Sequence, residues 1–213
     1  MNEEERRLII VSGLSGAGKT VVLNTLEDLS FYTIDNLPIS LLNKLIDEFC
    51  EENNKLANQI AIGIDARNNE DDLSFLPEAI ATLKNKGIAT EIIFIEANDD
   101  VLTKRFSETR RKHPLSSDTI SLTDAINHER KVIDAIAAAA DLRIDTSHMQ
   151  LHELRDIVYK RINQKNKDKL SLQFMSFGYK NGLPKDADFV FDLRCLPNPY
   201  WNKDLRKSSG KDQ

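Results

Sequence analysis

The sequence predicts an α/β fold in which a parallel sheet lies between two layers of helices. Short β-branched runs alternate along the chain with longer segments of helical spacing, and this alternation is typical of βαβ units. The first run, Leu8–Ser12 (LIIVS), is apolar almost throughout and is bounded by glycine. That pattern indicates a strand that is covered on both faces, as strands of parallel sheets are.

The first half of the chain provides three strands and two helices. Lys19–Leu29 has helical spacing, and the β-branched run Phe31–Ile34 follows it, so a right-handed strand, helix, strand unit is expected. Pro38 suits a first helical turn, and the apolar residues of 41–49 recur on one helical face. Ile60–Ile64 predicts the third strand.

The second half continues the alternation. The spacing predicts a helix over Leu73–Lys86 that stops at Gly87, and Glu91–Ile95 predicts the fourth strand. Val101–Arg111 predicts a basic helix closed by a proline. The remaining predicted elements are a helix from the capping box Ser121–Asp124 through Ala140, a strand at Leu142–Asp145 and a helix at Ser147–Ile162.

Residues 164–169 (QKNKDK) are polar and charged, which is the composition of an exposed linker. The predicted domains are therefore residues 1–163 and residues 170–213. Within the second, Leu170–Phe177 and Phe189–Leu193 predict strands. A few strands and a polar tail are too little for an independent core, so this C-terminal domain is expected to be incomplete.

The composition is that of a soluble globular protein. Of the 213 residues, 40% are hydrophobic and 30% are charged, which argues against a disordered or collagenous chain. No apolar run approaches the roughly 18 residues that span a bilayer, and the opening MNEEERR is too acidic for a signal peptide. We expect a cytoplasmic protein with no membrane partner. The net charge of −5 neither requires nor excludes RNA.

One motif carries the strongest functional signal. The segment GLSGAGKT matches G-x-x-x-x-G-K-[ST], with a predicted strand directly before it and a predicted helix directly after it. Its backbone N–H groups would cradle phosphates, the Lys19 ammonium would reach the β- and γ-phosphates as the catalytic group, and the Thr20 hydroxyl would bind Mg²⁺. The alternative is a glycine-rich turn that only supports the fold. The predicted phosphate-binding residues are Gly13, Leu14, Ser15, Gly16, Ala17, Gly18, Lys19 and Thr20.

With this motif, the fold class becomes a P-loop NTPase-type three-layer parallel sheet that binds a nucleoside triphosphate. Such a site uses a carboxylate at the end of a neighbouring strand to hold the metal. Asp35, Asp65 and Glu96 all end predicted strands, and each could instead cap a helix or close a turn. Asp35 and Asp65 are favoured, and Asp35 is assigned to the metal together with Thr20.

Two further polar groups are candidates for the site. Asp65, Ala66, Arg67 and Asn68 follow the third strand, at the sheet edge where open α/β sheets bind ligands. The aspartate could accept from a base or ribose and the arginine could reach phosphate, or the two could form a surface ion pair.

A basic run could neutralise phosphate charge or could be a solvated helix face. Its members are Arg105, Arg110, Arg111, Lys112 and His113.

The motifs together resemble the RapZ/YvcJ family of P-loop nucleotide-binding proteins. The resemblance covers residues 7–205 and is carried by GLSGAGKT, LNTLEDL, FYTIDNLP, IDARN, SETRRKHPLS, RIDTS and SFGYKNGLPKDADFVFDLRCLPNPYW. It implies binding and slow hydrolysis of ATP and GTP, with ATP on Gly13–Thr20 and a guanine-nucleotide contact at Asp65–Asn68. It also implies a regulatory role, with small regulatory RNA and an RNase as partners of full-length members.

Family members continue beyond the point at which this chain ends in LRKSSGKDQ. We therefore expect weak or no RNA binding by this form, because a short, polar basic tail does not form a preorganised surface for phosphates. The first hypothesis is a regulatory, homo-oligomeric protein with weak ATPase and GTPase activity. The second is a small-molecule P-loop kinase, since Asp35 resembles an acceptor-activating position and TRRKHP resembles an arginine-bearing lid.

Overall fold

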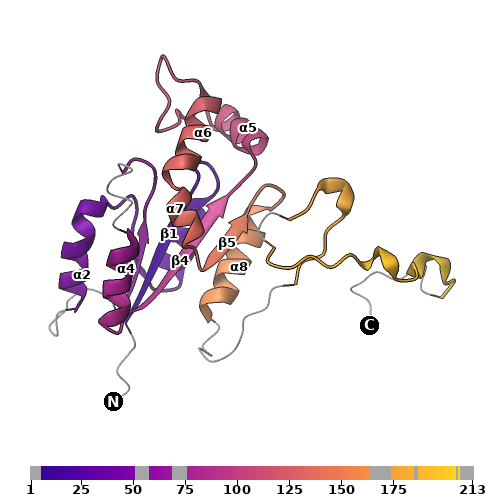
Figure 1. Cartoon of the computed structure of the whole chain (residues 1–213), viewed down its shortest axis with the longest axis horizontal. Helices are drawn as coiled ribbons and strands as arrows, with labels where there is room; N and C mark the ends of the chain where they lie inside the picture. The colour runs from indigo at the N-terminus through magenta and orange to yellow at the C-terminus, as the bar shows by residue number, and fades with distance from the viewer. Residues whose placement is uncertain are drawn as a thin grey trace. The chain divides into compact units, whose positions relative to one another are not determined.

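The computed structural model describes residues 6–50, 58–68, 76–163, 174–184, 187–204 and 206 (Figure 1). The chain divides into two compact units, Met1–Ser176 and Phe177–Gln213. Each unit is described by itself.

The first unit is built on a parallel sheet of five strands. The strands are β1 (Arg7–Gly13), β2 (Tyr32–Ile34), β3 (Gln59–Gly63), β4 (Ala89–Glu96) and β5 (Leu142–Asp145), in the order β2-β3-β1-β4-β5. The first strand is central and pairs in parallel with both β3 and β4. The loop that follows β1 therefore lies between the carboxyl ends of two neighbouring strands, where ligands of such sheets bind.

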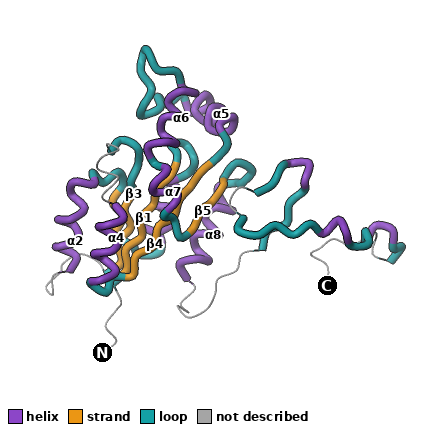
Figure 2. Tube along the Cα trace, in the orientation of Figure 1, coloured by secondary structure: helices purple, strands orange, loops and turns teal. Residues whose placement is uncertain are grey.

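Helices cover both faces of the sheet (Figures 1 and 2). On one face α1 (Lys19–Asp28) packs against α8 (Leu151–Asn163), and α4 (Leu76–Asn85) and α7 (Asp134–Ala138) cover the other. This arrangement confirms the predicted three-layer α/β class. The other helices of this unit within the described residues are η1 (Ile39–Leu41), α2 (Leu42–Cys50), α5 (Asp99–Thr109) and α6 (Leu122–Val132).

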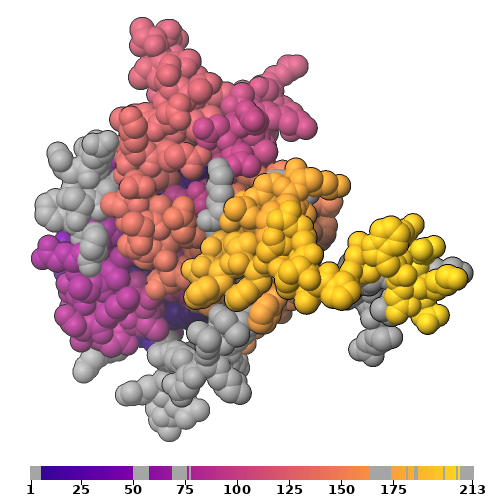
Figure 3. Space-filling view, turned by 45° about the vertical axis from the view of Figure 1, so that its right-hand side comes forward, coloured from indigo at the N-terminus to yellow at the C-terminus, as the bar shows by residue number. Residues whose placement is uncertain are grey.

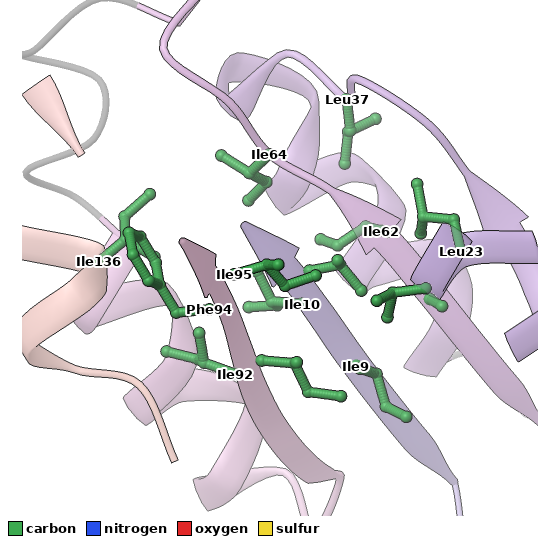
Figure 4. Close-up of a cluster of buried hydrophobic side chains, with 14 of the residues drawn as sticks. Ile9, Ile10, Leu23, Leu37, Ile62, Ile64, Ile92, Phe94, Ile95 and Ile136 are labelled. Carbon is green, nitrogen blue, oxygen red and sulfur yellow. The ribbon is translucent and has the colours of Figure 1, made fainter. Parts of the chain in front are cut away.

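The core lies on both sides of β1, which explains why that strand is apolar at nearly every position. Ile9 and Ile10 are fully buried and point to opposite faces of the sheet. Figure 4 shows Leu23 of α1 and Ile136 of α7 among the buried side chains around the central strands. Burying each such side chain contributes roughly 1.5–3 kcal/mol, so the strands that carry the nucleotide loop are held firmly.

Several element boundaries differ from the sequence predictions. The helix predicted through Ala140 is two helices, since the backbone leaves helical geometry at Ile133 (φ −98°, ψ 7°) between α6 and α7. The helix predicted from Ser147 begins at Leu151. The Asp145 carboxylate accepts hydrogen bonds from the backbone N–H and the hydroxyl of Ser147, and this local turn delays the helix.

The second unit contains short 3-10 turns, η2 (Tyr179–Asn181), η3 (Leu193–Cys195) and η4 (Pro199–Trp201). The strand predictions are wrong where they can be compared, because residues 174–177 and 189–193 form no strand. The side chains of Phe189 and Phe191 are 81% and 77% exposed, so neither is buried as a side chain on the covered face of a sheet would be. Figure 3 draws the described residues of this unit in orange to yellow. The predicted linker at 164–169 lies outside the described residues, and the domain boundary there stays a prediction.

Candidate nucleotide site

The loop between β1 and α1 has the backbone shape of a phosphate-binding loop. Gly13 ends the strand with φ +141°, and Gly18 precedes the first helical residue with φ +123°, a region that side chains disfavour. A Cβ on Gly13 would lie 1.9 Å from the carbonyl oxygen of Ile95, and the Leu14 N–H donates to that oxygen at 3.0 Å. Only glycine fits where the loop leaves β1.

The lysine of the motif folds back over this loop. Its Nζ donates to the carbonyl oxygen of Gly13 at 2.7 Å, and the side chain is half-buried. Burial lowers the pKa of Lys19, while the charges of Glu129, Asp65 and Asp35 oppose that shift, Glu129 most strongly. The ammonium therefore lies within reach of carboxylates from three different elements.

The other motif residues divide into supporting and exposed positions. Leu14 and Ala17 are buried, so their side chains support the loop, and Gly16 and Thr20 are exposed. Thr20 lies in the first turn of α1, where the positive end of a helix attracts anions. Its hydroxyl is accessible to a metal ion.

A carboxylate that the sequence analysis did not select contacts the loop directly. Glu129, on α6, accepts from the Ser15 N–H at 2.9 Å and from the Ser15 hydroxyl at 2.6 Å. The buried His113 ring lies behind it, with Nε2 3.1 Å from Oε2 of Glu129. The sequence does carry a signal, because Glu129 shares the buried helical face of Ala125 and Val132, and a charge on such a face requires a partner.

Arg105 contacts the loop as well. Its guanidinium donates to the carbonyl oxygen of Gly16 at 3.1 Å and to that of Thr146 at 2.8 Å. The Thr146 hydroxyl in turn donates to the carbonyl of Ala17 at 2.7 Å. Of the predicted basic run, Arg105 and the buried His113 therefore belong to the loop's support. The other three residues, Arg110, Arg111 and Lys112, are exposed, as on a solvated face.

The cluster after β3 is built around an ion pair. The Arg67 guanidinium donates to both carboxylate oxygens of Asp65, at distances from 2.6 to 3.1 Å. Burial alone would raise the pKa of Asp65, but the hydrogen bonds from Arg67 outweigh it and lower that pKa. Ala66 between them is buried. Arg67 itself is half exposed, so it can contact a ligand while it neutralises the aspartate.

Asp35 is exposed, unlike the carboxylates of Asp65 and Glu129. It follows β2, and a Cβ on Gly63 would lie 2.8 Å from its Oδ1, so the glycine at the end of β3 makes room for it. Oxygen ligands suit Mg²⁺, and Thr20 and Asp35 are both exposed residues with side-chain oxygens. The assignment of the metal to this pair stays a prediction. Within the described ranges, no cluster of three or more His, Cys, Asp or Glu side chains is arranged to hold a metal by itself.

Comparisons with known proteins show the family of this chain. The profile of the RapZ-like N-terminal domain matches residues 6–166, and that of the RapZ C-terminal domain matches residues 170–213. The chain belongs to the RapZ family. A nucleotide-binding protein of Hahella chejuensis is 50% identical over 207 residues, which are 97% of this chain and 72% of that protein.

One more relative and one solved structure are similar to this chain. A nucleotide-binding protein of Cellvibrio japonicus is 49% identical over 205 residues, 96% of this chain and 69% of that protein. A solved shikimate kinase from Acinetobacter baumannii has a TM-score of 0.49 and 17% identity, covering 77% of this chain and 97% of that one. Within the part of this RapZ-family chain that the structure describes, every helix is too short or too polar to cross a membrane.

In this RapZ-family chain Asn68 has an evident structural task. Its Oδ1 accepts from the Ile39 N–H at 2.9 Å, and its Nδ2 donates to the carbonyl oxygens of Asp65 and Leu37 at 3.1 and 3.5 Å. Both of its amide hydrogens are therefore directed at backbone carbonyls, and a nucleotide contact at Asp65–Asn68 stays a prediction. Asn68 connects the end of β3 to the segment after β2.

We expect Asn68→Ala to destabilise the protein by about 1–3 kcal/mol, because it leaves backbone groups at Ile39 and Leu37 without their partner. Urea unfolding followed by circular dichroism measures this loss. Asn127→Ala, at an exposed position of α6, is the matched control and should change stability by less than about 0.5 kcal/mol. Equal effects of the two substitutions would contradict the structural role of Asn68.

Proposed function

We propose that this chain is a regulatory nucleotide-binding protein that binds ATP and GTP with Mg²⁺ and hydrolyses both slowly. The observation that carries the proposal is the loop from Gly13 to Thr20, with its glycine-dependent shape and the inward-folded Lys19. A loop of this kind presents backbone N–H groups to phosphates. The curated relatives named as nucleotide-binding proteins support the same role.

The residues around the loop have separate tasks in this proposal. Lys19 would bind the terminal phosphates, and Thr20 with Asp35 would hold Mg²⁺. The metal, when bound, supplies positive charge that neutralises the phosphate oxygens. Arg67 and Asp65 would contact guanine nucleotide, with the Asp65 carboxylate kept ionised by the bidentate ion pair.

The biological setting follows from the family resemblance. The protein would act in the cytoplasm as a homo-oligomer in which bound nucleotide sets conformation or assembly. Small regulatory RNA and an RNase are the partners that the resemblance implies for full-length members of the family. We expect weak or no RNA binding by this chain. Nucleic-acid affinity comes largely from cations on an ordered surface, and this chain has a net charge of −5.

A small-molecule kinase is the second candidate. The observation that favours it is the exposed Asp35 at the rim of the site, next to Gly63, where a carboxylate could accept the proton of an acceptor hydroxyl. In that case water would have to be excluded while the phosphate moves to the acceptor. In the regulatory proposal, water is the acceptor.

The destination of the terminal phosphate separates the two functions. The protein is incubated with γ-labelled ATP or GTP and Mg²⁺, with and without a small-molecule fraction of cell extract, and the labelled products are separated. We expect slow release of labelled inorganic phosphate, unchanged by the extract. A labelled metabolite that forms only with the extract would support the kinase, and no turnover at all would contradict the NTPase activity.

A further inference from the structure

The contact between Glu129 and Ser15 places a carboxylate on a donor of the phosphate-binding loop. Both oxygens of the carboxylate are engaged, one by the Ser15 N–H at 2.9 Å and the other by the Ser15 hydroxyl at 2.6 Å. Backbone N–H groups of such a loop are the groups that bind phosphate oxygens. The Glu129 carboxylate therefore accepts a hydrogen bond from an N–H group that could otherwise bind a phosphate oxygen.

The carboxylate is held from behind. The Leu115 N–H donates to Nδ1 of His113 at 3.1 Å, so that nitrogen is the acceptor and Nε2 carries the hydrogen that is donated to Glu129. The ring is fully buried and packs against Phe106, with 5.1 Å between ring centroids. His113 therefore fixes the direction in which the carboxylate points.

The carboxylate is also ionised at neutral pH. Burial would raise the pKa of Glu129, but the hydrogen bonds from His113 and Ser15, together with the charge of Lys19, outweigh burial and lower it. Glu129 is 1% exposed, so water screens this negative charge weakly. The loop carries a fixed negative charge at Ser15.

This charge acts on the lysine of the loop. Of the carboxylates that act on the Lys19 ammonium, Glu129 has the largest effect, ahead of Asp65 and Asp35. A P-loop lysine is the group that reaches the β- and γ-phosphates. A triphosphate adds negative charge beside this lysine, and a diphosphate adds less, so repulsion from the Glu129 carboxylate acts more strongly on the triphosphate.

We propose that Glu129 determines the specificity of the site for the length of the phosphate chain, by competing with the terminal phosphate for Ser15. The inference rests on the proposed nucleotide binding at the P-loop. Diphosphate binds while the contact between Glu129 and Ser15 stays intact. Triphosphate binding breaks that contact and releases α6 from the loop, so the position of α6 reports the presence of the terminal phosphate.

The test compares ADP and ATP affinities of the full chain in the presence of Mg²⁺. We expect Glu129→Gln to raise ATP affinity about tenfold or more and to leave ADP affinity within about twofold, because it removes the charge at nearly constant shape. Glu108→Gln, at an exposed site on α5, removes an equal charge away from the loop. It should change neither affinity, which controls for net charge.

Ser15→Ala provides a second variant should Glu129→Gln fold poorly in thermal unfolding. It removes the hydroxyl that holds Glu129 and keeps the N–H, so the ratio of ATP affinity to ADP affinity should rise, by less than in Glu129→Gln. If the wild type binds both nucleotides and neither variant gains affinity selectively for ATP, the inference about Glu129 is overturned and the proposed function is not. Absence of binding to either nucleotide in all forms would overturn the proposed function together with it.

Discussion

Lys19→Ala is expected to lower triphosphate affinity by about two orders of magnitude or more while the protein stays folded. Charge-assisted hydrogen bonds contribute roughly 1.5–3 kcal/mol each, and two of them to the terminal phosphates would account for at least a hundredfold. In the free protein, the side chain of Lys19 donates a hydrogen bond to the Gly13 carbonyl, and burial lowers the pKa of its ammonium. Its removal therefore costs the fold little.

Nucleotide titration and thermal unfolding of the same samples check this result. Lys104→Ala is the matched control, because that lysine is exposed on α5 and pairs only loosely with Glu108, at 3.9 Å. It should bind nucleotide as the wild type does. Unchanged triphosphate affinity in Lys19→Ala would remove the basis of the proposed function, and a loss of folding would show that the lysine is structural.

Much of the fold could be predicted because its signals are local. The apolar run at Leu8–Ser12 can only be a strand buried on both faces, and the glycine spacing from Gly13 to Gly18 requires the loop that follows. All five predicted strands of the first unit are present in the structure. Their positions follow from hydrophobic periodicity, which depends on neighbouring residues and not on distant ones.

The contacts that complete the candidate site are not local. Glu129 lies 114 residues from Ser15 in sequence, and its carboxylate reaches the loop only because α6 folds over it. His113 looked like one member of a basic run, yet its ring is buried against Glu129. No short-range pattern pairs these residues. Likewise, Phe189–Leu193 has strand-like residues, but among the residues that the structure describes it pairs with no strand.

Gly13→Ala is expected to be the most destabilising single substitution in the loop, costing more than about 4 kcal/mol and abolishing nucleotide binding. The added Cβ would lie 1.9 Å from the carbonyl oxygen of Ile95, which is backbone and accepts from the Leu14 N–H. Relief requires β1 and β4 to separate at their carboxyl ends. That movement disrupts the sheet at the point from which the loop starts.

Gly87→Ala separates this clash from the cost of a positive φ. Gly87 has φ +75°, but no atom lies within 4 Å of the position that its Cβ would take, so only the backbone strain of about 1–2 kcal/mol remains. Urea unfolding of both variants gives the difference. We expect Gly13→Ala to be clearly less stable than Gly87→Ala. Equal stability of the two variants would mean that the positive φ of Gly13, and not its close approach to Ile95, requires glycine at this position.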